Sequence, residues 1–170
     1  MKKNITQSST ERLSDEEIGE FYRAHCLSVY RVCMAFLGNP ADAEDVMQET
    51  FLKWLGFGPA ENEAHELGRL VLTAENLCRD LLRRRRRFGR EDISDHMDLA
   101  AEDLSRRDRE LLDAVYRLPE KYKTAVFLFY YEDMTVEQIS RATGTRLATV
   151  KTRLHRARLL LRQELGDEDI

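Results

Sequence analysis

Apolar residues recur every three or four positions along most of the chain, the spacing that gathers them on one face of an α-helix. The first such run extends from Ile18 to Phe36. Ser14 and Glu17 stand three positions apart just before it and form a capping box, a signal for the start of a helix. Gly38 is the kind of residue at which helices end. The pattern therefore predicts a first helix between Ser14 and Gly38.

Two more amphipathic helices are predicted before residue 90. Asn39 and Pro40 fit the N-cap and the first position of the second helix, and a loop at 56–59 ends it. The third helix is long, from about Glu66 to Arg87. The inward positions are Ala43, Val46, Met47, Thr50, Phe51 and Trp54 in the second helix, and Leu67, Leu70, Val71, Ala74, Leu77, Cys78, Leu81 and Leu82 in the third. Three helices with such stripes can share one small core.

Helical periodicity resumes near Ser105, an N-cap candidate, and continues to the C-terminal end. Pro119 opens a further helix, Thr135 and Gln138 form a second capping box, and a final helix spans about 146–165. The inward positions are Leu111, Leu112, Val115 and Leu118, then Tyr122, Ala125, Val126 and Phe129, then Ile139 and Ala142, and finally Leu147, Val150, Leu154, Ala157 and Leu161.

The predicted fold is therefore all-α, with two small helical domains joined by a flexible linker. The first domain, 14–88, is a three- to four-helix bundle, and the second, 105–166, ends in a helix-turn-helix. The linker, 89–104, is polar and acidic and has little periodicity. About 20 extended residues reach about 65 Å, or about 19 base-pair steps. Two domains joined in this way could contact sites nearly two helical turns apart on one duplex.

Charge is distributed unevenly, although the formal net charge is only −4. Residues 138–163 contain seven Lys or Arg and no acid, and residues 83–90 contain six Arg and no acid. Residues 91–103, between them, contain six acids and no Lys or Arg. The phosphate backbone of DNA attracts basic segments of this kind.

Residues 135–165 fit a helix-turn-helix, which needs two helices, a tight turn and a small residue where the helices approach. Gly144 supplies the turn, Ser140 is the small residue, and Val150 and Leu154 anchor the second helix. The side chains predicted to reach base edges and phosphates are Arg146, Thr149, Lys151, Thr152, His155 and Arg156. The alternative, a basic face that is merely solvated, does not account for the capping box, the turn and the acid-free stretch together.

A second basic feature lies on the exposed side of the predicted third helix, at Asn76, Arg79, Arg83 and Arg84. An Asn among basic residues can hold an unpaired base by its polar edge while the charges bind phosphates. An arginine run near a helix C-terminus is also explained by the helix dipole. On the residues alone, both interpretations stay open.

The outer side of the predicted second helix carries acidic and amide side chains at helical spacing, Asp42, Asp45, Gln48 and Glu49. From the residues alone, an ordinary solvated face is the better interpretation of this stripe.

Other functional classes find little support. The four His are scattered and no CxxC occurs, so we expect no enzyme, no catalytic residue, no metal and no cofactor. Cys26, Cys33 and Cys78 are expected to be reduced thiols. With no long apolar run and no apolar N-terminal segment, we expect a cytoplasmic protein without membrane insertion.

Two segments carry a family resemblance. Residues 42–51, DAEDVMQETF, resemble region 2.2 of bacterial sigma factors. Residues 118–122, LPEKY, followed by residues 149–158, TVKTRLHRAR, resemble their region 4. This layout, over about 14–165, is similar to the extracytoplasmic-function (ECF) group of the sigma-70 family. The resemblance implies an alternative sigma factor that binds core RNA polymerase, recognises −35 and −10 promoter elements and promotes transcription initiation.

The same resemblance implies roles for the residues singled out above. The stripe at Asp42, Asp45, Gln48 and Glu49 would dock on the clamp helices of the polymerase β′ subunit. Asn76 and the arginines near it would capture the −10 element, with loop 56–66 forming the base pocket. The final helix would read the −35 element, and the linker would run toward the RNA exit channel. The implied partners are core polymerase, through its β′ clamp helices and β flap, promoter DNA and an anti-sigma factor.

Four positions depart from the family pattern. Arg69 stands where Trp is usual, Phe129 where many members have Arg, and Thr145 with Arg146 where Ile-Ser is common. The resemblance therefore does not indicate which promoter sequence is preferred. The alternative function is a stand-alone helix-turn-helix regulator with an N-terminal effector or dimerisation module. Such a regulator would bind specific duplex DNA unaided, whereas a sigma factor needs core polymerase.

Overall fold

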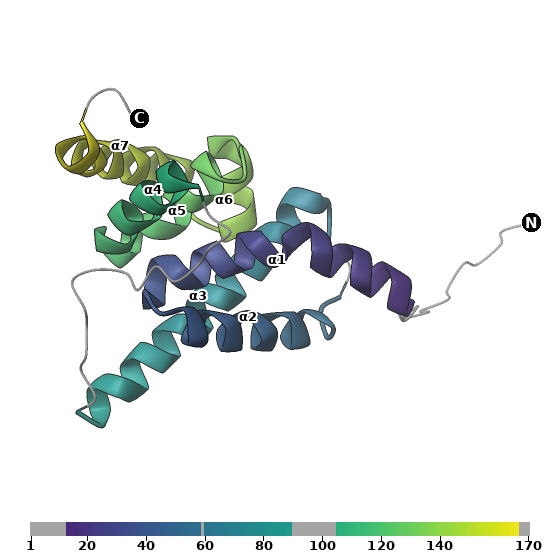
Figure 1. The fold of residues 1–170 in the computed structure, drawn as a ribbon. Helices are drawn as coiled ribbons and strands as arrows, with labels where there is room; N and C mark the ends of the chain where they lie inside the picture. Colours follow the sequence, from purple (N-terminus) through teal and green to yellow (C-terminus); the bar gives the residue numbers. More distant parts are fainter. Residues whose placement is uncertain (1–12, 59, 90–104, 167–170) are drawn as a thin grey trace, which may run out of the picture.

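A computed structural model describes residues 13–58, 60–89 and 105–166. These residues form seven α-helices and no strand (Figure 1), which confirms the predicted all-α class. The helices are α1 (Asp15–Leu37), α2 (Pro40–Trp54), α3 (Glu63–Arg87), α4 (Arg106–Arg117), α5 (Glu120–Tyr130), α6 (Val136–Thr143) and α7 (Leu147–Leu165).

Local capping sets most of the helix boundaries where the sequence predicts them. The backbone N–H of Glu17 donates to the hydroxyl of Ser14 over 3.2 Å, and the Glu17 carboxylate accepts from the Ser14 N–H over 2.8 Å. Gly38 ends α1 in the left-handed conformation, with φ of 65°. Helix α3 begins earlier than predicted, at Glu63, because the Asn62 side chain caps it.

The two groups of helices, α1–α3 and α4–α7, bury or half-bury the apolar stripes listed above, and Leu147 is the exception. Leu147 was predicted to point inward, but 37% of its surface is exposed. It is the first residue of α7, and Val150, one turn later, is the first α7 residue that is fully buried. Cys33 and Cys78 are buried and Cys26 is half-buried, all as free thiols.

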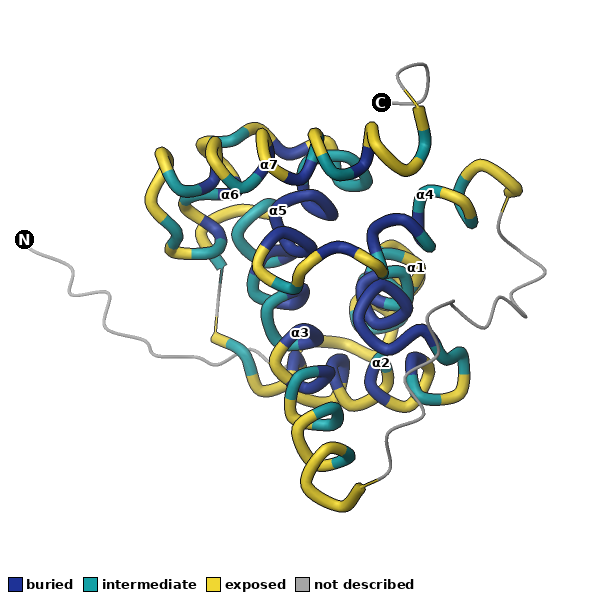
Figure 2. Tube along the Cα trace, turned by 90° about the vertical axis from the view of Figure 1, so that its left-hand side faces the viewer, coloured by how far each residue is buried: buried dark blue, intermediate teal, exposed yellow. Residues whose placement is uncertain are grey.

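The two groups of helices pack directly on one another, which the sequence did not predict (Figure 1). Their buried residues form one continuous cluster (Figure 2). A close approach joins α3 to α6 at Gly68, where an added Cβ atom would come within 2.4 Å of the Cβ of Ala142. Only glycine fits that position of α3 while the helices keep this spacing. The predicted linker lies outside the described residues apart from Gly89, so its flexibility stays a prediction.

Polar side chains also cross this junction, which we call the domain seam. It is formed by Ala35, Gly68, Glu75 and Arg79 on one side and by Glu120, Lys123, Thr124 and Ala142 on the other. The buried Thr124 hydroxyl donates to the buried Glu75 carboxylate. The Lys123 ammonium donates to the carbonyl of Ala35 over 2.7 Å. That carbonyl belongs to the last turn of α1, so a side chain of α5 caps the end of α1.

No helix within residues 13–58, 60–89 and 105–166 combines the length and apolar character that a membrane crossing requires.

Lys123 should make stability depend on pH. Burial lowers its pKa to about 8, against the opposing charge of Glu120. Between pH 8 and the ordinary lysine value of about 10.4, the unfolded chain therefore holds a proton that the folded chain has released. The free energy of unfolding should therefore rise with pH across that window. The rise is about 1.4 kcal/mol for each unit by which folding lowers the pKa of Lys123.

The measurement is urea unfolding from pH 7 to pH 10.5 for the wild type and Lys123→Met. The difference between the two proteins isolates Lys123, because all other titrating groups are shared. We expect the wild type to gain stability relative to Lys123→Met as pH rises. A constant difference across the window would contradict the assignment.

Candidate nucleic-acid and partner interfaces

Helices α6 and α7 form the predicted helix-turn-helix. Gly144 adopts a left-handed conformation, with φ of 64°. The Ser140 hydroxyl donates to the carbonyl of Thr145 over 2.7 Å, which ties α6 to the entry of α7. Ile139 and Val150 are buried on the inner sides of the two helices. The small residue and the turn glycine therefore do what the sequence analysis assigned to them.

The outer face of α7, which we call the recognition face, carries the predicted contact residues. Lys151, Thr152, His155 and Arg156 are exposed, and Thr149 is half-buried beside them. Arg146 is exposed at the N-cap position, where its side chain makes no capping bond. This face can present hydrogen-bond donors and positive charge to a major groove.

A hollow of about 310 Å³ adjoins the recognition face and adds residues that the sequence analysis did not identify. It is lined by Lys121, Tyr122, Ala148, Thr149, Thr152, Arg153 and Arg156. Tyr122 lies beside the cationic side chains of Lys121 and Arg156 in this lining. Three cations around a hydroxyl suit a phosphate group. Arg153 could have been found from sequence, because it shares a helix face with Thr149 and Arg156.

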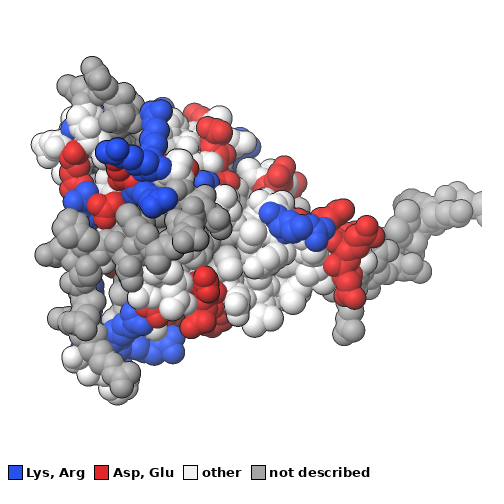
Figure 3. Space-filling model, viewed as in Figure 1, with Lys and Arg blue, Asp and Glu red and all other residues white. Residues whose placement is uncertain are grey.

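The last turns of α3 project from the body of the molecule (Figures 1 and 2). Lys and Arg side chains gather at this end (Figure 3), where Arg83 and Arg84 are exposed. Asn76 is also exposed, as predicted for the −10 face. Arg79 is different, because its guanidinium binds the buried Glu75 and, over 3.2 Å, Glu120 of α5. In this structure, the guanidinium of Arg79 is therefore already engaged in ion pairs at the domain seam.

The residues of the acidic stripe of α2 also differ in whether they have a partner within the chain. Asp45, Gln48 and Glu49 are exposed. Asp42 accepts a bond of 2.7 Å from Arg85 of α3, and its side chain is only 20% exposed. Asp42 thus holds α2 against α3, and the remaining three side chains form the free part of the stripe.

An apolar groove of about 270 Å³ continues the α2 stripe toward α1. It is lined by Ile18, Tyr22, Gln48, Phe51, Leu52, Trp54 and Leu55. Leu52 is 70% exposed and Leu55 52% exposed. Solvent-exposed leucines next to acidic side chains are typical of a surface that binds another protein. The sequence analysis did not identify these leucines, although Leu52 follows Asp45, Gln48 and Glu49 at helical spacing.

Trp54 forms the floor of the groove. Its ring stacks on that of Phe21 with centroids 4.0 Å apart, and its indole N–H donates to Glu66 over 3.0 Å. These contacts join all three helices of the first group. The groove is therefore built on a side chain with little freedom to move.

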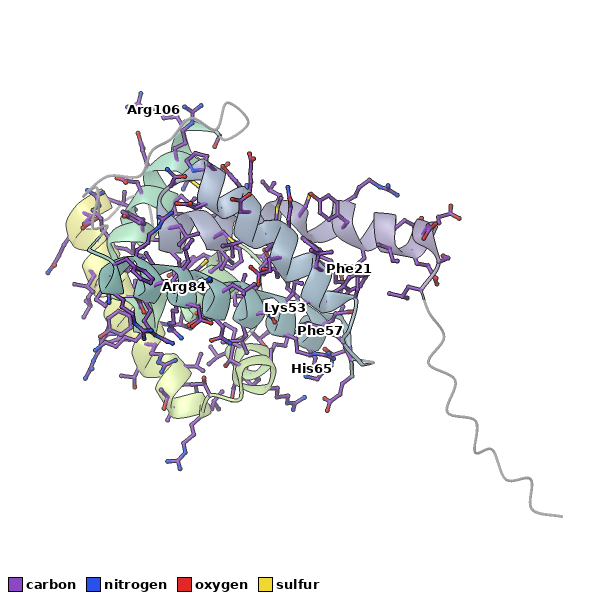
Figure 4. All side chains as sticks on the ribbon, turned by 90° about the horizontal axis from the view of Figure 1, so that it is seen from below. Phe21, Lys53, Phe57, His65, Arg84 and Arg106 are labelled. Carbon is purple, nitrogen blue, oxygen red and sulfur yellow. The ribbon has the colours of Figure 1, made fainter. Side chains whose placement is uncertain are left out.

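The loop before α3 is organised by Arg69, which stands where the family usually has Trp. Its guanidinium lies over the Phe57 ring, 4.5 Å from the centroid, and donates to the carbonyl of Gly58 over 2.8 Å. Phe57 and His65 lie at one end of α3 and Arg84 near the other (Figure 4). Arg69 thus supplies a flat side chain and a hydrogen bond at this loop.

No group of His, Cys, Asp and Glu within the described ranges is arranged to hold a metal ion.

These features define the class of the protein as an all-α helix-turn-helix DNA-binding protein with a second, helical interaction unit. Comparisons with known proteins identify the family. Residues 21–88 match sigma-70 region 2, and residues 108–161 match sigma-70 region 4.

Individual sigma factors are also similar to this chain. The chain is 35% identical to the ECF RNA polymerase sigma factor SigE of Mycolicibacterium smegmatis, over 86% of this chain and 61% of that protein. It is 32% identical to RNA polymerase sigma factor SigV of Bacillus subtilis, over 86% of this chain and 89% of SigV. The sigma factor RpoE of Bartonella quintana, solved with the anti-sigma factor NepR, shares the fold with a TM-score of 0.71. That likeness has 18% identity and covers 90% of this chain and 99% of the solved one.

The chain belongs to the sigma-70 family, in the ECF group of RNA polymerase sigma factors. Its function is that of an alternative sigma factor in transcription initiation.

The Trp54–Glu66 bond should contribute measurably to the stability of the groove. Trp54→Phe keeps an aromatic ring but removes the N–H donor, which leaves the half-buried Glu66 without that partner. We expect a loss of about 1–2 kcal/mol in urea unfolding followed by circular dichroism. In a double-mutant cycle with Glu66→Met, which removes the acceptor, additive effects of the two changes would contradict a direct interaction.

Proposed function

We propose that this sigma factor binds core polymerase through α2, unpaired −10 DNA through α3 and duplex −35 DNA through α7. The recognition face carries the proposal, because it is an exposed helix surface with basic and hydroxyl side chains and no acid. The rival function, a stand-alone regulator, has no comparable support, because the matches to regions 2 and 4 together cover most of the chain.

At the −35 element, we assign two kinds of contact. Lys151, Thr152, His155 and Arg156 project outward and would reach base edges in the major groove. Thr149 and Arg146 lie at the entry of the helix, where contacts to the backbone are common. The hollow beside them would hold a phosphate between Lys121 and Arg153.

At the −10 element, Asn76 would bind an unpaired base through its amide, and Arg83 and Arg84 would neutralise phosphates. Arg79 would join them once its bonds to Glu75 and Glu120 are released. Loop 56–66, which Arg69 holds at the other end of α3 from Arg84, would form the base pocket.

For the polymerase, the exposed acids Asp45 and Glu49 and the leucines of the groove form one continuous surface on α2. Such a surface fits an amphipathic helix with apolar and basic side chains, as expected of the β′ clamp helices. Asp42 would act indirectly, because its bond with Arg85 holds α2 in place. The β flap would contact region 4. An anti-sigma factor would cover the groove; the solved RpoE is in complex with such a factor.

In this proposal the chain carries out no covalent chemistry and acts in the cytoplasm, where core polymerase binds it. Polymerase would hold both DNA-binding units at a set separation, so that two weak contacts become effectively intramolecular.

Reversing the charge of the α2 surface should abolish polymerase binding. In reconstituted transcription, core polymerase and the wild type should give defined start sites from a genomic DNA library. Asp45→Lys with Glu49→Lys should lower holoenzyme formation at least about tenfold, because like charges would face the clamp helices. A matched control, Glu110→Lys with Glu137→Lys, makes the same change of net charge on region 4. Normal start sites from the α2 variant would reject the assignment.

Lys121 and Arg156 should differ in what they recognise. Lys121→Ala should weaken duplex binding about equally for all sequences and reduce the salt slope by about one, because it removes a phosphate contact. Arg156→Ala should instead relax base preference at one position of the −35 element, by about 1–3 kcal/mol. Holoenzyme binding to randomised −35 libraries at several salt concentrations separates the two effects. Equal loss of sequence preference in both variants would rule out this division of roles.

A further inference from the structure

A second hollow, of about 240 Å³, adjoins the hollow beside the recognition face. Its walls come from α3, α5, α6 and α7. One wall is apolar and is formed by Leu72, Ala125, Ile139 and Val150. Leu72 is half-buried, and the other three are buried. We call this space the inner hollow, and the space of about 310 Å³ beside the recognition face the outer hollow.

Two cations stand between the hollows, because Lys121 of α5 and Arg153 of α7 line both of them. Arg153 is half-buried, and within residues 13–58, 60–89 and 105–166 its guanidinium has no ion pair and no hydrogen bond. Lys121 lies over the ring of Tyr122, with Nζ 5.1 Å from the centroid, and has no carboxylate partner in the same part of the chain. Partial burial is costly for a charge without a partner. The two side chains therefore favour an anion between them.

An acid also lines the inner hollow, but its charge is already compensated. One carboxylate oxygen of Glu75 accepts from the Thr124 hydroxyl, and the other binds the guanidinium of Arg79. Arg79 lines the hollow as well, whereas Glu120, its second partner, does not. The positive charge of the two cations between the hollows is therefore not cancelled within the lining.

The lining indicates the chemistry of a ligand. A phosphomonoester carries a charge between about −1.5 and −2 at pH 7, which matches two cations better than the single charge of a carboxylate. The apolar wall suits an organic group on the ester oxygen. That group must be small, because ligand sites usually measure about 300–1,000 Å³. We propose that the inner hollow binds a small phosphomonoester, with its phosphate between Lys121 and Arg153 and its organic group against the apolar wall.

Such a ligand would compete with the −35 element, a consequence that rests on the proposed function. In that proposal, a DNA phosphate lies in the outer hollow between the same two side chains. One pair of cations cannot bind two phosphates as strongly as one. The ligand should therefore lower the affinity for duplex DNA, and duplex DNA should lower the affinity for the ligand by the same factor.

Three probes test the ligand class. Isothermal titration calorimetry on the full chain, at constant ionic strength, gives the affinity for each. Phenyl phosphate is a phosphomonoester with a small apolar group, inorganic phosphate lacks that group, and benzoate carries a single charge. We expect phenyl phosphate to bind at least about tenfold more tightly than either comparator, because only phenyl phosphate matches both the cations and the apolar wall.

Leu72→Phe tests the location, because it fills the inner hollow and leaves both cations in place. It should abolish binding of phenyl phosphate and leave the affinity for a short mixed-sequence duplex unchanged. Leu27→Phe is the matched control, since Leu27 lies on α1 outside both hollows and is 47% exposed. This control should retain both affinities. Circular dichroism verifies that helix content is unchanged in every variant.

Two further variants separate the hollows. Ala148 lines only the outer hollow, so Ala148→Leu should weaken duplex binding and retain phenyl phosphate. Arg153→Met should lower the affinity for phenyl phosphate about tenfold and reduce the salt slope of duplex binding by about one. Arg141→Met removes the same charge from α6, outside both hollows. It should bind phenyl phosphate as the wild type does.

Competition is measured by fluorescence anisotropy of the labelled duplex at constant ionic strength. Saturating phenyl phosphate should lower the duplex affinity of the wild type about fivefold, but not that of Leu72→Phe. The ligand site is rejected if phenyl phosphate binds no more tightly than inorganic phosphate, or equally well to Leu72→Phe. Equal binding of benzoate would overturn the choice of a phosphate. Binding that Leu72→Phe abolishes, but that leaves duplex affinity unchanged, would reject the proposed −35 phosphate contact while the ligand site stands.

Discussion

The contact on which the rest of this structure depends is the close approach of α3 and α6. At Gly68 there is no room for a side chain, because Ala142 of the second group of helices occupies it. That approach lets two small cores merge into one cluster of buried residues. Small cores gain disproportionately from such merging, because the buried fraction of surface rises with size. This glycine and alanine, together with the packing of α1 against α4 and α5, set the position of region 4 on region 2.

Once the helices are so close, charged groups are buried with them. Glu75 and Lys123 are each only 5% exposed, and each finds its hydrogen-bond partner across the seam, in Thr124 and in the carbonyl of Ala35. Buried ionic groups contribute little to net stability, because desolvation offsets their attraction. They do penalise every arrangement in which their partners are missing. The seam is therefore specific in its geometry.

Some charged side chains of the proposed binding surfaces form ion pairs within the chain. Asp42 and Arg79 both belong to patterns that a sequence assigns to partners, and both are engaged inside the chain instead. Asp42 holds α2 to α3 and so supports the proposed polymerase surface from behind. Arg79 links α3 to α5, so one residue of the proposed −10 surface contacts region 4. Each ion pair thus couples one surface to the arrangement of the helices beneath it.

The sequence by itself determined the all-α class, nearly every helix boundary and the recognition face. These depend on contacts within one helical turn, such as Ser14 with Glu17, or on periodicity along one helix. Short motifs also indicated the family, and the comparisons confirm that family.

Only the tertiary structure decided the seam, the apolar groove and the engagement of Asp42 and Arg79. The partners there are 43 residues apart for Asp42 and Arg85, 41 for Arg79 and Glu120, and 88 for Lys123 and Ala35. Periodicity shows which side of a helix is apolar, but not which distant helix covers it. That choice depends on how complete side chains fit together in three dimensions.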